Sequence, residues 1–277
     1  MPKVSIILPC YNVKPYLERC LESITNQKFT DWELICIDDC SSDESLNVLK
    51  MFKDDYEGNN KIIIHSFEKN QGTSVARNKG MEIASGEWLC FVDPDDWIHK
   101  NFIQNLINNS EGMDIVKGFR VKDGDYRATK GLCKRINENG CYAFTHEWQS
   151  AIYRKEIFTH QFVSGLITGQ DILWLTECIF KTEKVKLVEN AYYMYCRRCD
   201  SSNSDIYSFD KIISLCEVYV KILDIIRGSI KKEYSDSKYT LYISRMVSLL
   251  NLQFKADSSD GVSYVLSAYE KECKKGL

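Results

Sequence analysis

The chain has 277 residues, a net charge of −3 and a pI near 5.9, so its charge gives no general reason to bind nucleic acid. Its apolar fraction of 44% is ordinary for a globular protein, and no apolar run reaches the ~20 residues that a membrane-spanning helix needs. The N-terminal sequence MPKVSIILPCYN lacks the layout of a signal peptide, and we therefore expect a cytoplasmic protein.

The first hundred residues alternate between strand and helix patterns. Apolar runs of strand length lie at 4–8, 33–38, 61–67 and 88–92. Stretches with helical spacing lie between them, at 14–27, 41–52 and 75–84, and the second opens on Ser41-x-x-Glu44, the sequence of a capping box. This rhythm predicts an α/β fold in which a mostly parallel sheet has helices on both faces.

The rest of the chain has a looser pattern. Weak strands are predicted at 113–119 and 184–195, with a helix at 171–182. From 206 onward the apolar stripes are helical, and SSNSD at 201–205 is typical of a mobile loop. We expect three parts, which are residues 1–110, residues 111–205 and a helical extension at 206–277.

The twelve cysteines are scattered along the chain. Cys36 and Cys90 lie inside strand-like runs, where a cysteine acts as a small apolar side chain. The one CxxC pair, Cys196 with Cys199, has no second pair and is weak evidence for zinc. We expect most of these cysteines to be structural.

Polar residues follow each of the four predicted strands. In open parallel sheets, ligands bind beyond the carboxyl ends of the strands, so these residues should gather at one edge. They are Pro9-Cys-Tyr11-Asn12, Asp38-Asp39, Asn70-Gln-Gly72 and Asp93-Pro-Asp95-Asp96.

Their chemistry suits a nucleotide and a metal ion. Tyr11 offers a ring face for stacking on a base, Asp39 offers acceptors for a ring N–H, and Arg77 offers fixed donors. Asp93 and Asp95 would repel each other at a strand end, and a divalent cation such as Mg²⁺ or Mn²⁺ would relieve that repulsion and neutralise a diphosphate. A solvated acidic turn and a helix-capping Asp39 are the alternatives.

Four blocks of this sequence resemble the successive blocks of family 2 glycosyltransferases in order and spacing. They are SIILPCYN, ELICIDDCSSDES, NQGTSVARNKG and GEWLCFVDPDDW, and the resemblance is close over 2–105 and looser to 205. It implies a GT-A fold, a nucleotide-sugar donor and a divalent metal. In such a fold, 1–110 would be the nucleotide-sugar-binding half and 111–205 the acceptor-binding half, with the helical extension added after them. By position, Pro9, Tyr11, Asp39 and Arg77 match nucleotide-binding residues, Asp93 the ribose-facing first Asp of the DxD motif, Asp95 the metal-binding Asp, and Asp96 an extra member of the motif.

The family inverts the anomeric carbon and uses a general base. GQDILW at 169–174 resembles the block that supplies this base, which would make Asp171 the base, with Gln170 where relatives usually carry Glu. The same Asp171 is well placed to be a helix N-cap. Two blocks depart from the family, because Gln149-Ser-Ala151 stands where a Trp-Asn-Lys often occurs, and Cys196 stands where an Arg usually follows the last Tyr.

The resemblance therefore implies an inverting, metal-dependent glycosyltransferase that uses a UDP-sugar. Its implied acceptor is a growing surface glycan or glycolipid, such as lipopolysaccharide or capsule, and contact with the inner face of the membrane is part of this hypothesis. A sugar nucleotidyltransferase is an alternative, but it would need a Gly-rich loop where this chain has Pro9-Cys-Tyr-Asn12. A module that binds a nucleotide-sugar or a partner transferase without turnover is another. The donated sugar and the oligomeric state stay open.

Overall fold

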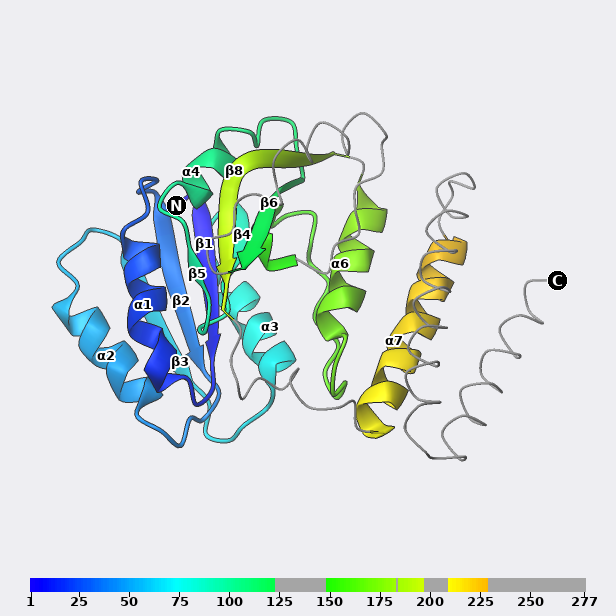
Figure 1. Cartoon of the computed structure of the whole chain (residues 1–277), viewed down its shortest axis with the longest axis horizontal. Helices are drawn as coiled ribbons and strands as arrows, with labels where there is room; N and C mark the ends of the chain where they lie inside the picture. Colours follow the sequence, from blue (N-terminus) through cyan, green and yellow to red (C-terminus); the bar gives the residue numbers. More distant parts are fainter. Residues whose placement is uncertain (123–147, 183, 197–208, 229–277) are drawn as a thin grey trace. The chain divides into compact units, whose positions relative to one another are not determined.

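Figure 1 shows a computed structural model of the chain, which describes residues 1–122, 148–182, 184–196 and 209–228. The chain forms two compact units. The first comprises 1–164 and 181–200, and the second comprises 165–180 and 201–277. The boundaries predicted at 110 and 205 stay a prediction. The predicted loop at 201–205 and the part of the predicted helical extension after residue 228 lie outside the described residues.

The first unit contains an eight-stranded sheet in the order β3-β2-β1-β4-β7-β6-β8-β5 among the described residues. Its strands are β1 (Val4–Cys10), β2 (Trp32–Asp38), β3 (Lys61–Ser66), β4 (Trp88–Phe91), β5 (Trp97–Ile98), β6 (Ile115–Lys122), β7 (Ala151–Arg154) and β8 (Val185–Tyr195). Neighbouring strands from β3 to β4 are parallel, as are β6 and β8, whereas β7 and β5 are antiparallel to their neighbours. The predicted α/β class and the mostly parallel sheet are confirmed.

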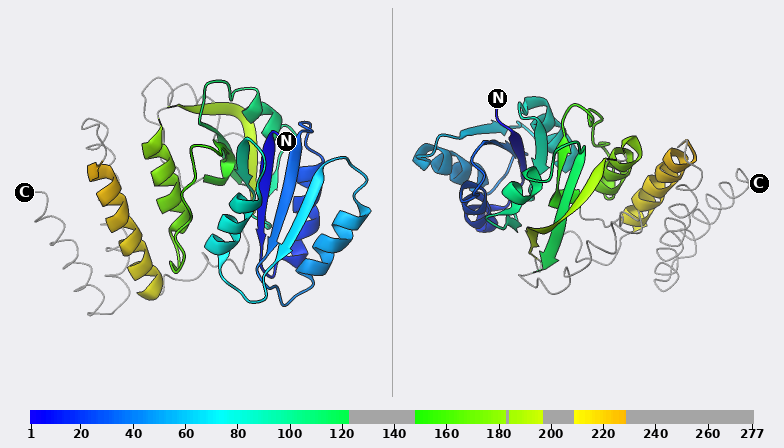
Figure 2. Two further views of the ribbon diagram at one scale, coloured as in Figure 1. Left: turned by 180° about the vertical axis from the view of Figure 1, so that it is seen from behind. Right: turned by 90° about the horizontal axis from the view of Figure 1, so that it is seen from above.

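Helices cover both faces of this sheet, as predicted. The described helices of this unit are α1 (Lys14–Thr25), α2 (Ser45–Asp55), α3 (Thr73–Ile83) and α4 (Phe102–Ile107), whereas α6 (Gln170–Lys181) and α7 (Phe209–Gly228) belong to the second unit. Leu17 of α1 packs in one apolar cluster with Ile6 and Leu8 of β1, and α2 lies beside α1 in every view (Figures 1 and 2). Gly80 of α3 lies against Ile7, whose side chain points to the opposite face.

The predicted capping box is wrong, because α2 begins at Ser45 rather than near Ser41. The Ser41 hydroxyl instead accepts the backbone N–H of Asn12 at 3.1 Å, so it joins two loops and does not cap a helix. Asp43 Oδ1 accepts the backbone N–H of Ser45 at 2.9 Å. The polar side chains at 41–43 therefore link the loop after β2 to the loop after β1.

The buried cysteines behave as small apolar side chains, as expected. Cys10, Cys20, Cys36 and Cys90 all lie in the apolar cluster of the first unit. Burial raises the pKa of the Cys36 and Cys90 thiols to about 12, so both stay protonated near neutral pH. Cys199 of the CxxC pair lies outside the described residues.

The contact between α3 and β1 predicts a destabilising Gly80→Ala substitution. A Cβ atom at Gly80 would lie 2.4 Å from Ile7 Cγ2, and a β-branched side chain in a strand has little freedom to move away. We expect Gly80→Ala to lower the free energy of unfolding by about 1–3 kcal/mol in urea denaturation. In an Ile7→Ala background the clash is absent, so the same substitution should be neutral or stabilise by up to ~1 kcal/mol through helix propensity. An equal loss in both backgrounds would contradict this packing.

Candidate active site

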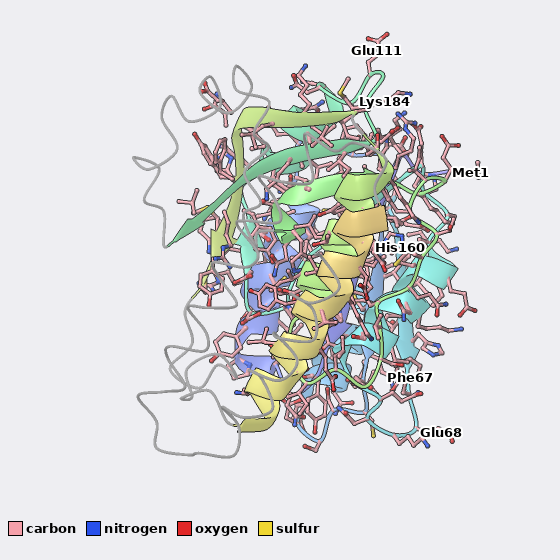
Figure 3. All side chains as sticks on the ribbon, turned by 90° about the vertical axis from the view of Figure 1, so that its right-hand side faces the viewer. Met1, Phe67, Glu68, Glu111, His160 and Lys184 are labelled. Atoms are coloured by element: carbon pink, nitrogen blue, oxygen red, sulfur yellow. The ribbon has the colours of Figure 1, made fainter. Side chains whose placement is uncertain are left out.

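The carboxyl ends of the four parallel strands share one edge of the first unit. Figure 3 shows Phe67 and Glu68, which follow β3, at one end of this unit, and Glu111 and Lys184 at the other. Because β1, β2 and β4 run parallel to β3, their ends reach the same edge as Phe67. The predicted nucleotide-binding and metal-binding residues of the first unit are therefore brought together at this edge.

The loops after β1 and β2 are tied to each other. Asn12 has a left-handed backbone with φ of 52°, and its side-chain Oδ1 accepts the backbone N–H groups of Ser42 at 2.8 Å and Asp43 at 3.3 Å. Pro9 lies within β1, and Tyr11 directly after β1 is 49% exposed. The Tyr11 ring is thus accessible for stacking, as its predicted role requires.

Asp39 is 3% exposed and holds the loop before α3. Its Oδ1 accepts the backbone N–H of Gln71 at 2.7 Å and its Oδ2 accepts that of Gly72 at 2.8 Å. Each carboxylate oxygen has a second lone pair, which is what the predicted contact with a base N–H would use. That contact stays a prediction, while the loop-holding role is a finding that the sequence analysis missed.

Arg77 and Asp93, predicted separately, form an ion pair. Arg77 Nη2 lies 3.1 Å from Asp93 Oδ1, and the guanidinium carbon lies 4.4 Å from the centre of the Trp148 ring. Gln149 Nε2 donates to the other Asp93 oxygen at 2.8 Å. Both oxygens of the Asp93 carboxylate therefore have a polar partner. One of these partners is Gln149, which the sequence pattern marked only as a departure from the family.

Asp96 is 2% exposed and is bonded to β8. Its Oδ1 accepts the backbone N–H of Cys196 at 2.9 Å, and the Tyr193 hydroxyl forms a second hydrogen bond to it. The same Tyr193 oxygen accepts the backbone N–H of Asp93 at 2.9 Å. Burial, followed by the charges of Asp93 and Asp95, raises the pKa of Asp96 to about 8. Its predicted part as a metal ligand stays a prediction.

Asp95 is half-buried, and a cation from α1 lies beside it. Arg19 Nη2 donates to the Asp95 backbone oxygen at 3.2 Å and lies 2.9 Å from Cys196 Sγ. Within the described residues, no group of three or more His, Cys, Asp or Glu side chains is arranged to hold a metal ion. Mg²⁺ and Mn²⁺ sites that use one or two carboxylates and phosphate oxygens need no such group, and the oxygens of this turn fit that chemistry.

Asp171, the predicted base, belongs to the second unit. It is the second residue of α6 and is half-buried, and its Oδ1 lies 3.0 Å from the backbone nitrogen of Ile172. The Gly169 carbonyl accepts the Leu173 N–H at 3.0 Å and so begins the helix. The role of Asp171 as the base stays a prediction.

Residues 5–170 match the family model described as Glycosyl transferase family 2. The chain belongs to this family. Over 223 residues it is 30% identical to a poly(ribitol-phosphate) β-N-acetylglucosaminyltransferase, TarP of Staphylococcus aureus, covering 73% of the chain and 65% of TarP. Across the curated relatives, the share of their own length that the chain spans falls from 72% to 14%.

Two solved glycosyltransferases have the same fold. S. aureus TarS 1–349 in complex with UDP-GlcNAc superposes with a TM-score of 0.68 at 22% identity, covering 95% of this chain and 75% of that one. A mannosyltransferase from Pyrobaculum calidifontis, crystallised with GDP-Man and Mn²⁺, superposes with a TM-score of 0.65 at 13% identity, covering 97% and 80%. The expected GT-A fold is confirmed.

Of the helices described, none has the length and apolarity that a membrane crossing demands.

The bonds of Tyr193 predict a loss of stability in Tyr193→Phe. Removing the hydroxyl leaves the Asp93 N–H and the Asp96 carboxyl without a shared partner inside a buried site. We expect the free energy of unfolding to fall by about 1–3 kcal/mol, measured by urea denaturation. Tyr192→Phe is the matched control, since its exposed hydroxyl bonds to Asn190 at 3.1 Å and its loss should cost less than ~0.5 kcal/mol. Equal effects of the two substitutions would refute the buried role of Tyr193.

Proposed function

We propose that this chain is an inverting, metal-dependent glycosyltransferase that moves a sugar from a UDP-sugar to a hydroxyl group of a surface glycan. The observation that carries the proposal is the edge of the sheet at the carboxyl ends of the parallel strands, where the loops are hydrogen-bonded to one another. There, an exposed Tyr11 follows β1 and a buried Asp39 follows β2, while Asp93, which is paired with Arg77 of α3, follows the neighbouring strand β4. These are the groups that a nucleotide and its metal would require.

The donor would bind along this edge. Tyr11 would stack on the base and Asp39 would accept a ring N–H, which suits uracil. Asp93, oriented by Arg77 and Gln149, would face the ribose, and Asp95, with Asp96 behind it, would hold Mn²⁺ or Mg²⁺. The bound ion would neutralise charge on the departing nucleoside diphosphate.

The acceptor hydroxyl would lose its proton to Asp171. Its oxygen forms the new bond to C1 while the bond from C1 to the diphosphate breaks on the opposite side, which inverts the anomeric carbon. The transferred group is a hexose or an N-acetylhexosamine, and TarP and TarS support a UDP-GlcNAc donor as the first to test. The names of relatives support a surface glycan acceptor, and we place the reaction in the cytoplasm at the inner face of the membrane.

Substitution of Asp95 tests the metal site. We expect Asp95→Ala to weaken donor binding in the presence of Mn²⁺ by at least ~10-fold in calorimetry, and to leave the weak binding that remains in chelator unchanged. Asp55→Ala removes an exposed aspartate at the end of α2 and should bind the donor as the unmodified chain does. Unaltered metal-dependent binding by Asp95→Ala would assign the metal to other residues.

Substitution of Asp171 tests turnover. We expect Asp171→Asn to bind the donor normally and to transfer sugar ~10²- to 10⁴-fold more slowly, measured as UDP released in the presence of acceptor. Asp224→Asn, at an exposed position of α7, is the control and should keep full activity. Near-normal transfer by Asp171→Asn would exclude this residue as the base. Donor binding without transfer by the unmodified chain would favour a binding module.

A further inference from the structure

The second unit contains a buried serine hydroxyl that makes all of its hydrogen bonds to the backbone of one turn. Ser214 lies on α7 and is 5% exposed. Its Oγ accepts the backbone N–H groups of Ile167 at 3.1 Å and Thr168 at 3.3 Å, and donates to the Thr168 carbonyl at 3.2 Å. A serine hydroxyl has one donor and two acceptor positions, so all three are used on this turn.

The next residue of the turn packs against the same helix. Gly169 has φ of 83°, a conformation that glycine adopts without cost. A Cβ atom there would lie 3.1 Å from Val218 and 3.2 Å from Leu215, both on α7. Figures 1 and 2 show α6 and α7 side by side. Hydrogen bonds from the Ser214 side chain to the backbone of the turn, together with the packing of Gly169 on α7, thus hold the three residues that precede α6.

The turn leads directly into Asp171. The Gly169 carbonyl accepts the Leu173 N–H, so the turn sets where α6 begins and which way its first side chains point. A general base must lie within hydrogen-bond reach of the proton that it removes, and a displacement of about 1 Å can cost ~10²-fold in rate. A residue that fixes the conformation of this turn therefore also fixes the position of the Asp171 carboxylate, two residues after Gly169.

We propose that Ser214 is a positioning residue for Asp171, so that α7 forms part of the catalytic unit and not only an appendage to the fold. The inference rests on the proposed function, and it gives the helical extension a role in the chemical step. This role requires no contact between Ser214 and the donor or the acceptor. Ser214 would act through the backbone of Ile167 and Thr168, which three hydrogen bonds join to α7.

The test is a double-mutant cycle on transfer rate, made in the full chain. We expect Ser214→Ala to lower kcat by about 10- to 100-fold, with donor KM and UDP affinity changed by less than ~2-fold. Ser214→Thr keeps the hydroxyl and should recover most of the rate. In an Asp171→Asn background, Ser214→Ala should change the residual rate by less than ~2-fold, because its effect passes through the Asp171 carboxylate.

Each other outcome overturns the inference. An equal loss of rate from Ser214→Ala in both backgrounds would show a general structural effect, and unchanged kcat in the otherwise unmodified chain would show no effect on the base. If Ser214→Ala does not fold, the comparison of Ser214→Thr with Ser214→Val isolates the hydroxyl at constant shape, and equal kcat values would reject the role. Full activity of Asp171→Asn alone would instead refute the proposed base, and Ser214 with it.

Discussion

Repulsion between the three carboxylates that follow β4 is the constraint on which the first unit depends. Asp93, Asp95 and Asp96 lie within four residues, and the side chains of two of them are held by different elements of the unit. Asp93 is paired with Arg77 from α3, whereas Asp96 is bonded to the end of β8. The turn is therefore held by elements about a hundred residues apart. Burial and this repulsion raise the pKa of Asp96, whereas at Asp93 the repulsion is offset by the charge of Arg77.

This constraint explains why a buried arginine is stable at the edge of the sheet. Arg77 is 6% exposed, and a guanidinium in that environment needs a charge partner and a polarisable surface. Asp93 gives the first and the Trp148 ring the second. The ion pair thus stabilises both charges and sets the direction of the Asp93 carboxylate. The same contact therefore contributes to the stability of the first unit and to the geometry of its candidate site.

The early part of the fold was predictable because parallel strands buried on both faces appear as apolar runs, and the carboxyl ends of such strands share an edge. Those two rules predict that Tyr11, Asp39 and Asp93 lie at one edge of the sheet, but they do not give the strand order. Gln149 and Tyr193 could not be found in this way. They lie beside or on strands whose partners are distant in sequence, and β5 and β7 are too short, at two and four residues, to leave a pattern. The capping box failed for a similar reason, since Asn12 engages the Ser41 hydroxyl.

The most direct test of the account is calorimetric titration of the full chain with UDP-sugars and GDP-sugars, each in Mn²⁺, in Mg²⁺ and in chelator. The account predicts that one UDP-sugar binds with micromolar to millimolar affinity when metal is present, that chelator weakens the binding by at least ~10-fold, and that UDP is slowly released. Absence of binding to every nucleotide-sugar in the presence of metal would contradict it, and the Asp93–Asp96 turn would then be a structural acidic turn.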